Sequence, residues 1–179
     1  MWKLLGIVLL LAGVAGILCT CFSEGKEKQR RVENVILFLQ KSRYTMQNEK
    51  VKVINYFRRY IEQDILLQSD SSVLLERALA EIIEKLSSNV YPHGQMVWEE
   101  VFRKEEQNWN LDCETFEIIV QAGNGFFGRS RMENINLLEK SIRELEAQQA
   151  KMKQKYVQER KVWVPVGMLG TMMIIILFL

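Results

Sequence analysis

The side chains that most often do chemistry are few in this sequence and are not spaced for it. The single histidine, His93, lies in a Tyr-Pro-His-Gly segment without a cysteine or acidic residue at a metal-ligand spacing. Cys19 and Cys21 are separated by one residue, which is neither a redox nor a zinc-binding spacing. We interpret the cysteines as small, lipid-facing or packed thiols, and we predict no metal and no cofactor.

Carboxylates occur in adjacent pairs, Glu99-Glu100 and Glu105-Glu106, among other helical charges. Such pairs are typical of solvated helix faces. The signature patterns of serine hydrolases, zinc proteases and P-loop proteins do not occur in the sequence. We therefore predict that the protein is not an enzyme but an interaction scaffold.

Three glycines within six residues, Gly123, Gly125 and Gly128, form the most unusual local segment. Glycine permits a sharp turn or a close approach of the backbone. A phosphate-binding loop is excluded, since no Lys-Ser or Lys-Thr follows the last glycine and no strand precedes the first. We predict a helix–helix turn plugged by Phe126 and Phe127, and we treat the three glycines as a candidate hinge or turn.

The elements that position these residues are set by the distribution of charge. All but Lys3 of the 24 lysines and arginines, and all 22 acidic residues, lie between Glu24 and Lys161. The two apolar ends are each long enough for one helical crossing of a bilayer. We predict transmembrane helices at 1–22 and 162–179 around a helical cytoplasmic domain at 23–161. A cleaved signal peptide at the first end and a buried core helix at the second are the alternatives.

Basic residues flank both apolar runs on the side of the middle domain, at Lys26, Lys28, Arg30 and Arg31 and again between Lys151 and Lys161. Cytoplasmic flanks carry an excess of lysine and arginine, so we predict a cytoplasmic middle domain and both termini outside. The net charge of the middle domain is near zero, which argues against nucleic-acid binding. Small residues at spacings of four, which let membrane helices pack closely, occur at Ala12 and Gly16 and at Gly167 and Thr171.

The middle domain has helical periodicity throughout, and no alternating run of strand length competes with it. An apolar stripe from Val32 predicts a helix that continues out of the first membrane span. Further stripes predict helices beginning near Val53 and Val73, a short helix around Trp98, and a helix capped by Asp112. The last helix, from about Met132 to Lys161, carries an imperfect heptad seam and is expected to continue into the terminal apolar run. We therefore predict an all-α fold, a helical bundle between two membrane helices. The seam fits a homo-oligomeric coiled coil and packing onto its own domain equally well.

This layout resembles the stage III sporulation protein AB family of endospore-forming bacteria. The resemblance covers the whole chain and rests on short motifs. They are the start Met1-Trp2-Lys3-Leu4-Leu5-Gly6, the amphipathic run 30–40, Trp98, the segment AGNGFFGRS at 122–130, and a long helix at 134–161 before the glycine-containing end 167–179.

The resemblance implies a soluble domain similar to the cytoplasmic domain of the type II secretion inner-membrane platform protein. It also implies partners, namely a cytoplasmic secretion-type ATPase and other proteins of the channel between mother cell and forespore. The expected location is the mother-cell membrane surrounding the forespore. Two alternatives remain open: a generic platform for secretion or pilus assembly, and a membrane-anchored sensor or enzyme.

Overall fold

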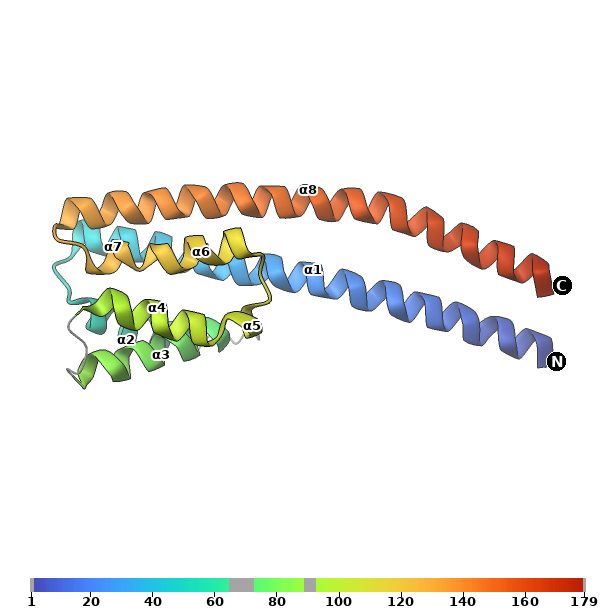
Figure 1. Cartoon of the computed structure of the whole chain (residues 1–179), viewed down its shortest axis with the longest axis horizontal. Helices are drawn as coiled ribbons and strands as arrows, with labels where there is room; N and C mark the ends of the chain where they lie inside the picture. Colours follow the sequence, from blue (N-terminus) through green and yellow to red (C-terminus); the bar gives the residue numbers. More distant parts are fainter. Residues whose placement is uncertain (1, 65–72, 89–92, 179) are drawn as a thin grey trace. The chain divides into compact units, whose positions relative to one another are not determined.

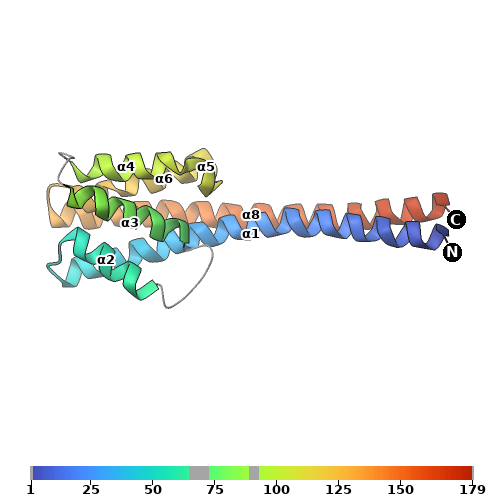
Figure 2. The same ribbon diagram turned by 90° about the horizontal axis from the view of Figure 1, so that it is seen from below.

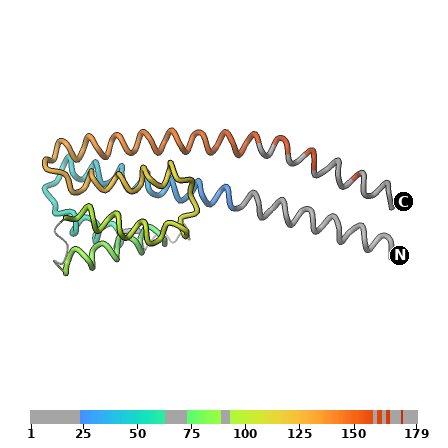
Figure 3. Tube along the Cα trace, in the orientation of Figure 1, coloured from blue at the N-terminus to red at the C-terminus, as the bar shows by residue number. Residues whose placement is uncertain are grey.

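The structure is a computed structural model that describes the backbone of residues 2–64, 73–88 and 93–178 (Figure 1). Side chains are described for most residues between 24 and 158 and for a few after 158 (Figure 3). Over these residues it is helical and contains no strand, so the prediction of an all-α fold is confirmed. The helices are α1 (Trp2–Asn48), α2 (Val53–Asp64), α3 (Val73–Ser87), α4 (Gly94–Lys104), α5 (Glu106–Trp109), α6 (Cys113–Ala122), α7 (Asn124–Phe127) and α8 (Arg131–Phe178).

The helices form two compact units. The first, a helical pair, consists of Met1–Gln29 and Ala150–Leu179. The second, the bundle, consists of Arg30–Gln149 and contains α2 to α7 with one segment each of α1 and α8. Within the bundle these helices run alongside one another, as the two views in Figures 1 and 2 show.

Over the part of the chain that the structure describes, no helix has an apolar stretch long enough to cross a membrane. The predicted spans, 1–22 and 162–179, lie outside the residues with described side chains, apart from 162, 165, 166 and 172. The same holds for the side chains of the four candidate membrane-packing residues, which are Ala12, Gly16, Gly167 and Thr171. Membrane insertion and the domain boundaries at 22 and 162 therefore stay predictions.

The centre of the bundle is aromatic. Phe38 of α1 lies against Phe57 of α2, with ring centroids 5.7 Å apart, and against Phe126 of α7 at 5.6 Å. Trp98 of α4 contacts Phe126 at 5.2 Å and Phe102 at 4.5 Å. All five rings are at least 97% buried. Large rings bury more apolar surface than any other side chain, so this cluster ties α1, α2, α4 and α7 together.

Local signals place most helix boundaries where the sequence predicts them. Asp112 caps α6, since its carboxylate accepts the backbone N–H of Thr115 at 3.0 Å. The short helix α5 was not predicted, because one turn is too brief to show a periodicity. Val73 begins α3 as predicted but is 45% exposed, and Leu75 points into the core instead.

The last helix begins at Arg131, close to the predicted start, and continues to Phe178 without a break. Pro165 therefore lies inside α8. Proline lacks an N–H, so the carbonyl of Lys161, four residues earlier, loses its usual helical donor there. The first helix is equally continuous, from Trp2 to Asn48.

Candidate functional site

The glycine segment, Gly123 to Gly128, connects α6 to α8 and encloses the four residues of α7. None of the described glycines has a positive φ. The segment therefore does not use the left-handed conformations that glycine permits. Its glycines instead let side chains of other helices approach the backbone closely. This is the second of the two roles that the sequence suggested.

Each glycine of the segment faces a side chain from another helix. A Cβ atom on Gly123 would lie 2.5 Å from Gln95 Oε1 and would also meet the ring of Trp98. On Gly125 it would lie 2.6 Å from Leu138 Cγ, and on Gly128 it would collide with Asn134. Real Cβ atoms do not come this close, so the segment is packed tightly against α4 and α8. Whether it also acts as a hinge stays a prediction.

The indole of Trp98 fixes the same region from the α4 side. Its Nε1 donates a hydrogen bond to the carbonyl oxygen of Ile119 in α6 at 3.1 Å, inside the core. A buried indole N–H needs such a partner, because leaving it unpaired costs free energy. Of the two phenylalanines predicted to plug the turn, Phe126 is buried in the aromatic cluster, whereas Phe127 is only half-buried and lies against Gly94.

Near the end of α1 the surface is hollowed between α1 and α2. This tyrosine groove has a volume of about 520 Å³, within the range of natural binding pockets. Its wall includes Tyr44, which is 68% exposed, and Tyr60, which is only 5% exposed. The complete lining is Gln40, Lys41, Tyr44, Thr45, Glu49, Tyr56, Arg59 and Tyr60.

Charges are arranged asymmetrically in the tyrosine groove. Arg59 and Glu49 form an ion pair at 3.0 Å, so they largely neutralise each other. The ammonium of Lys41 lies 5.1 Å from the centre of the Tyr60 ring, a cation–π contact, and makes no ion pair with any described residue. The groove thus combines tyrosine rings with one unneutralised positive charge. The sequence did not predict this groove, because its residues come from two helices.

A ladder of ion pairs covers the outer side of α3, α4 and α6. Arg103 of α4 binds Glu117 of α6 at 2.8 Å and Glu99 at 2.9 Å. Both hydrogen bonds raise the pKa of Arg103, the one to Glu117 most, and the hydrogen bond from Arg103 lowers the pKa of Glu117. Lys104 and Lys85 bind Glu81 of α3, and they hold the pKa of Glu81 below its usual value, Lys104 contributing most. Exposed ion pairs of this kind link helices at modest strength.

Two arginines join the long helices to distant chain segments within the bundle. Arg31 of α1 donates from Nη1 to the carbonyl oxygens of Asn108 and Trp109 at the end of α5, at 2.9 and 2.8 Å. Arg131 of α8 donates to the carbonyl oxygens of Met46 and Gln47 in the last turn of α1, at 2.5 and 2.6 Å. Carbonyls at a helix C-terminus lack intrahelical donors, so both arginines act as caps supplied from elsewhere.

The remaining chemistry-bearing residues do not converge. His93 is exposed at the start of α4, and the described residues contain no group of three potential metal ligands. Glu99 and Glu100 are in ion pairs on the surface. Cys113 is exposed, which corrects the interpretation of the cysteines as packed or lipid-facing; it is the first residue of α6 and points outward beside its cap. The side chains of Cys19 and Cys21 lie outside the described residues.

Comparisons with known proteins agree on one family. A family model described as stage III sporulation protein AB matches residues 3–179. A solved structure titled stage III sporulation protein AB superimposes with a TM-score of 0.61 at 17% sequence identity, covering 73% of this chain and 97% of that chain. At this identity the superposition shows a shared fold. No curated protein matches the sequence.

Proposed function

The chain belongs to the stage III sporulation protein AB family, and we propose that it acts in sporulation as a membrane platform. In this role it engages a secretion-type ATPase on the cytoplasmic side and helps to assemble the channel between mother cell and forespore. It works as a scaffold and not as an enzyme.

The observation that carries this proposal is the way in which the two long helices are built into the bundle. α1 and α8 each run without a break from an apolar end of the chain into the bundle. There the arginine cap from Arg131 joins the end of α1 to the start of α8. A partner that displaces the bundle would therefore act on both helices together, as a platform requires.

A second feature that supports a scaffold is the fixed arrangement of the short helices. The aromatic cluster joins α1, α2, α4 and α7, and the ion-pair ladder joins α3, α4 and α6. Close packing of this kind transmits displacement rather than absorbing it. The bundle can thus pass a displacement at one surface to its own segments of α1 and α8.

Location in the mother-cell membrane, with a cytoplasmic bundle and both termini outside, is part of the proposal. Its support is the sequence: two charge-free ends with lysine and arginine on the side of the bundle. Protease added to intact protoplasts should leave the bundle uncut, and permeabilised protoplasts should lose it. Cleavage of the bundle in intact protoplasts would reverse the proposed orientation.

The function itself is tested by deleting the gene and following sporulation by microscopy with a membrane dye. We expect cells to complete engulfment and then to stall with shrunken forespores, and the intact gene to restore spores. Purification of the full-length protein in detergent should co-purify the ATPase. Normal spores after deletion would refute the sporulation role, and loss of spores without ATPase binding would refute only the choice of partner.

A further inference from the structure

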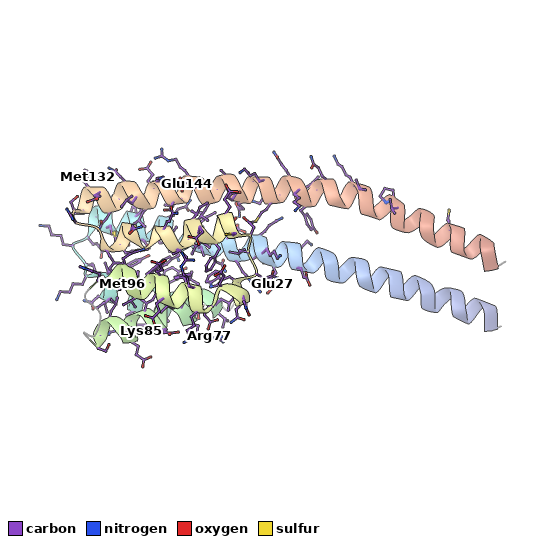
Figure 4. The ribbon with its side chains drawn as sticks, viewed as in Figure 1. Glu27, Arg77, Lys85, Met96, Met132 and Glu144 are labelled. Atoms are coloured by element: carbon purple, nitrogen blue, oxygen red, sulfur yellow. The ribbon has the colours of Figure 1, made fainter. Side chains whose placement is uncertain are left out.

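Two side chains of the bundle stand out because they are large, apolar and mostly in contact with solvent. Tyr44 of α1 and Met132 of α8 are both 68% exposed, more than any other large apolar side chain described in the bundle. Figure 4 labels Met132 at the start of α8. Covering exposed apolar side chains of this size by a partner lowers the free energy, because apolar surface is removed from water.

The surroundings of Tyr44 define what would cover it. The tyrosine groove offers tyrosine rings and the ammonium of Lys41, which has no acidic partner among the described residues. A carboxylate beside an apolar, flexible side chain satisfies both features. Methionine suits the rings especially well, since its sulfur makes favourable contacts with aromatic rings.

The start of α8 has the complementary chemistry. Met132 is followed directly by Glu133, an exposed residue of the first turn of the helix. The Glu133 carboxylate makes no ion pair with any described residue, and Met132 does not line the tyrosine groove of its own chain. A mostly exposed apolar side chain and a carboxylate without an ion pair among the described residues are therefore consecutive in the first turn of α8.

The groove and the Met132–Glu133 pair lie at the same end of the bundle. Arg131 binds the carbonyl oxygens of Met46 and Gln47, and the groove is lined by their neighbours Tyr44 and Thr45. Two copies that stand side by side in the same direction therefore present the groove of one at the level of Met132 in the other. Copies anchored in one membrane have this relation.

We propose that this end of the bundle is a contact between copies of the chain, in which Met132 and Glu133 of one copy occupy the tyrosine groove of its neighbour. Met132 covers the exposed ring of Tyr44, and Glu133 pairs with Lys41. The contact is small and therefore weak between freely diffusing copies. It forms when membrane anchoring holds the copies side by side, because their effective concentration is then high. It rests on the membrane anchoring that is part of the proposed function, and not on the role in sporulation.

The direct test is cross-linking between two differently tagged full-length chains expressed together in the host. Both carry serine in place of Cys19, Cys21 and Cys113; one then carries Tyr44→Cys and the other Met132→Cys. We expect a mixed-tag disulfide dimer, formed at least about fivefold more than with Met96→Cys as the second chain, because disulfides require close Cβ atoms. Met96 is the matched control, an exposed methionine on α4.

Equal yields for Met132→Cys and Met96→Cys would overturn the proposal. So would cross-links from Tyr44→Cys that reach a different protein and never a second copy, since they would assign the groove to another occupant.

Charge exchange tests the same contact independently. In the cross-linking pair, Lys41→Glu or Glu133→Lys alone places like charges together and should lower the yield about three- to tenfold. Carrying both changes restores opposite charges and should bring the yield back to within about twofold of the parent.

Glu133 also stabilises the first turn of α8 through the helix dipole. That local effect predicts no rescue by Lys41→Glu. A double variant that is folded by circular dichroism but still fails to cross-link would therefore refute the contact.

Discussion

Gly125 and Leu138 lie so close together that a methyl group on Gly125 would be 2.6 Å from Leu138 Cγ. The two residues come from α7 and α8, and Leu138 is fully buried. The glycine segment is therefore one wall of the core and not a loose connection. Alanine at these glycines tests the packing of the bundle before it tests any hinge.

Gly125→Ala should lower the free energy of unfolding by about 1–3 kcal/mol, the usual cost of forcing an extra carbon into a packed core. In a Leu138→Ala background the same change should cost less than half as much, because Cγ and Cδ2 of Leu138 are gone and only the tighter contact of 3.1 Å with the backbone nitrogen of residue 138 remains. Urea unfolding of the full-length protein in detergent, followed by tryptophan fluorescence, measures both. If Gly125→Ala cost the same in the two backgrounds, the close contact with Leu138 would be refuted.

Arg131→Gln should destabilise the bundle by about 1 kcal/mol, because it removes two charge-assisted hydrogen bonds that are partly exposed to water. Arg131→Lys should recover less than half of this, since an ammonium cannot reproduce the fork that reaches both Met46 and Gln47. Arg129→Gln is the matched control, an exposed arginine two residues earlier with no partner among the described residues. Thermal unfolding of the three variants decides the matter; equal shifts for Arg129 and Arg131 would contradict the capping role.

Trp98→Phe should cost about 2–4 kcal/mol, since it both empties part of the aromatic cluster and removes the donor to the carbonyl of Ile119. Phe102→Leu, next to it, also loses ring volume but no hydrogen bond, and should cost less. Hydrogen exchange of the amides of α6 distinguishes the two, because only loss of the Trp98 hydrogen bond releases α6 directly. Unchanged protection of α6 in Trp98→Phe would show that the indole N–H contributes little.

The link between Arg103 and Glu117 should make stability depend on pH in acid. Hydrogen bonding to Arg103 lowers the pKa of Glu117 below its ordinary value of 4.5. A carboxyl group with a depressed pKa in the folded state stabilises the fold above its ordinary pKa, and this contribution is lost as the pH falls through the folded value. The wild type should therefore lose stability below pH 4.5 more steeply than Arg103→Gln.

NMR titration of the Glu117 carboxyl carbon measures the pKa of this residue directly and tests the same ion pair. In Arg103→Gln its pKa should return toward the ordinary value, whereas Glu106→Gln should leave it unchanged. Identical acid profiles for the wild type and Arg103→Gln would mean that the ion pair does not persist in solution.

The helices were predictable because their signals are local. Apolar residues at spacings of three and four mark the buried faces of α2, α4 and α6, and Asp112 marks the start of α6 within one turn. The family was recognisable from short motifs for the same reason. The predicted membrane spans rest on charge-free runs, which are also local and remain predictions.

The glycine segment shows where local signals end. Its three glycines indicated either a turn of unusual conformation or a close approach to the backbone, and the sequence does not distinguish the two. The choice depends on Leu138 and Trp98, which reach the segment from other helices.

What the sequence by itself determined was the class of the protein: helices throughout the described chain, and a charged middle between apolar ends. The tertiary structure alone decided which residues meet. Arg131 binds Met46 across 85 positions, and the tyrosine groove exists only where α1 and α2 lie together. Helix periodicity depends on neighbours within a turn, whereas these contacts depend on how whole helices pack, and no local pattern records that arrangement.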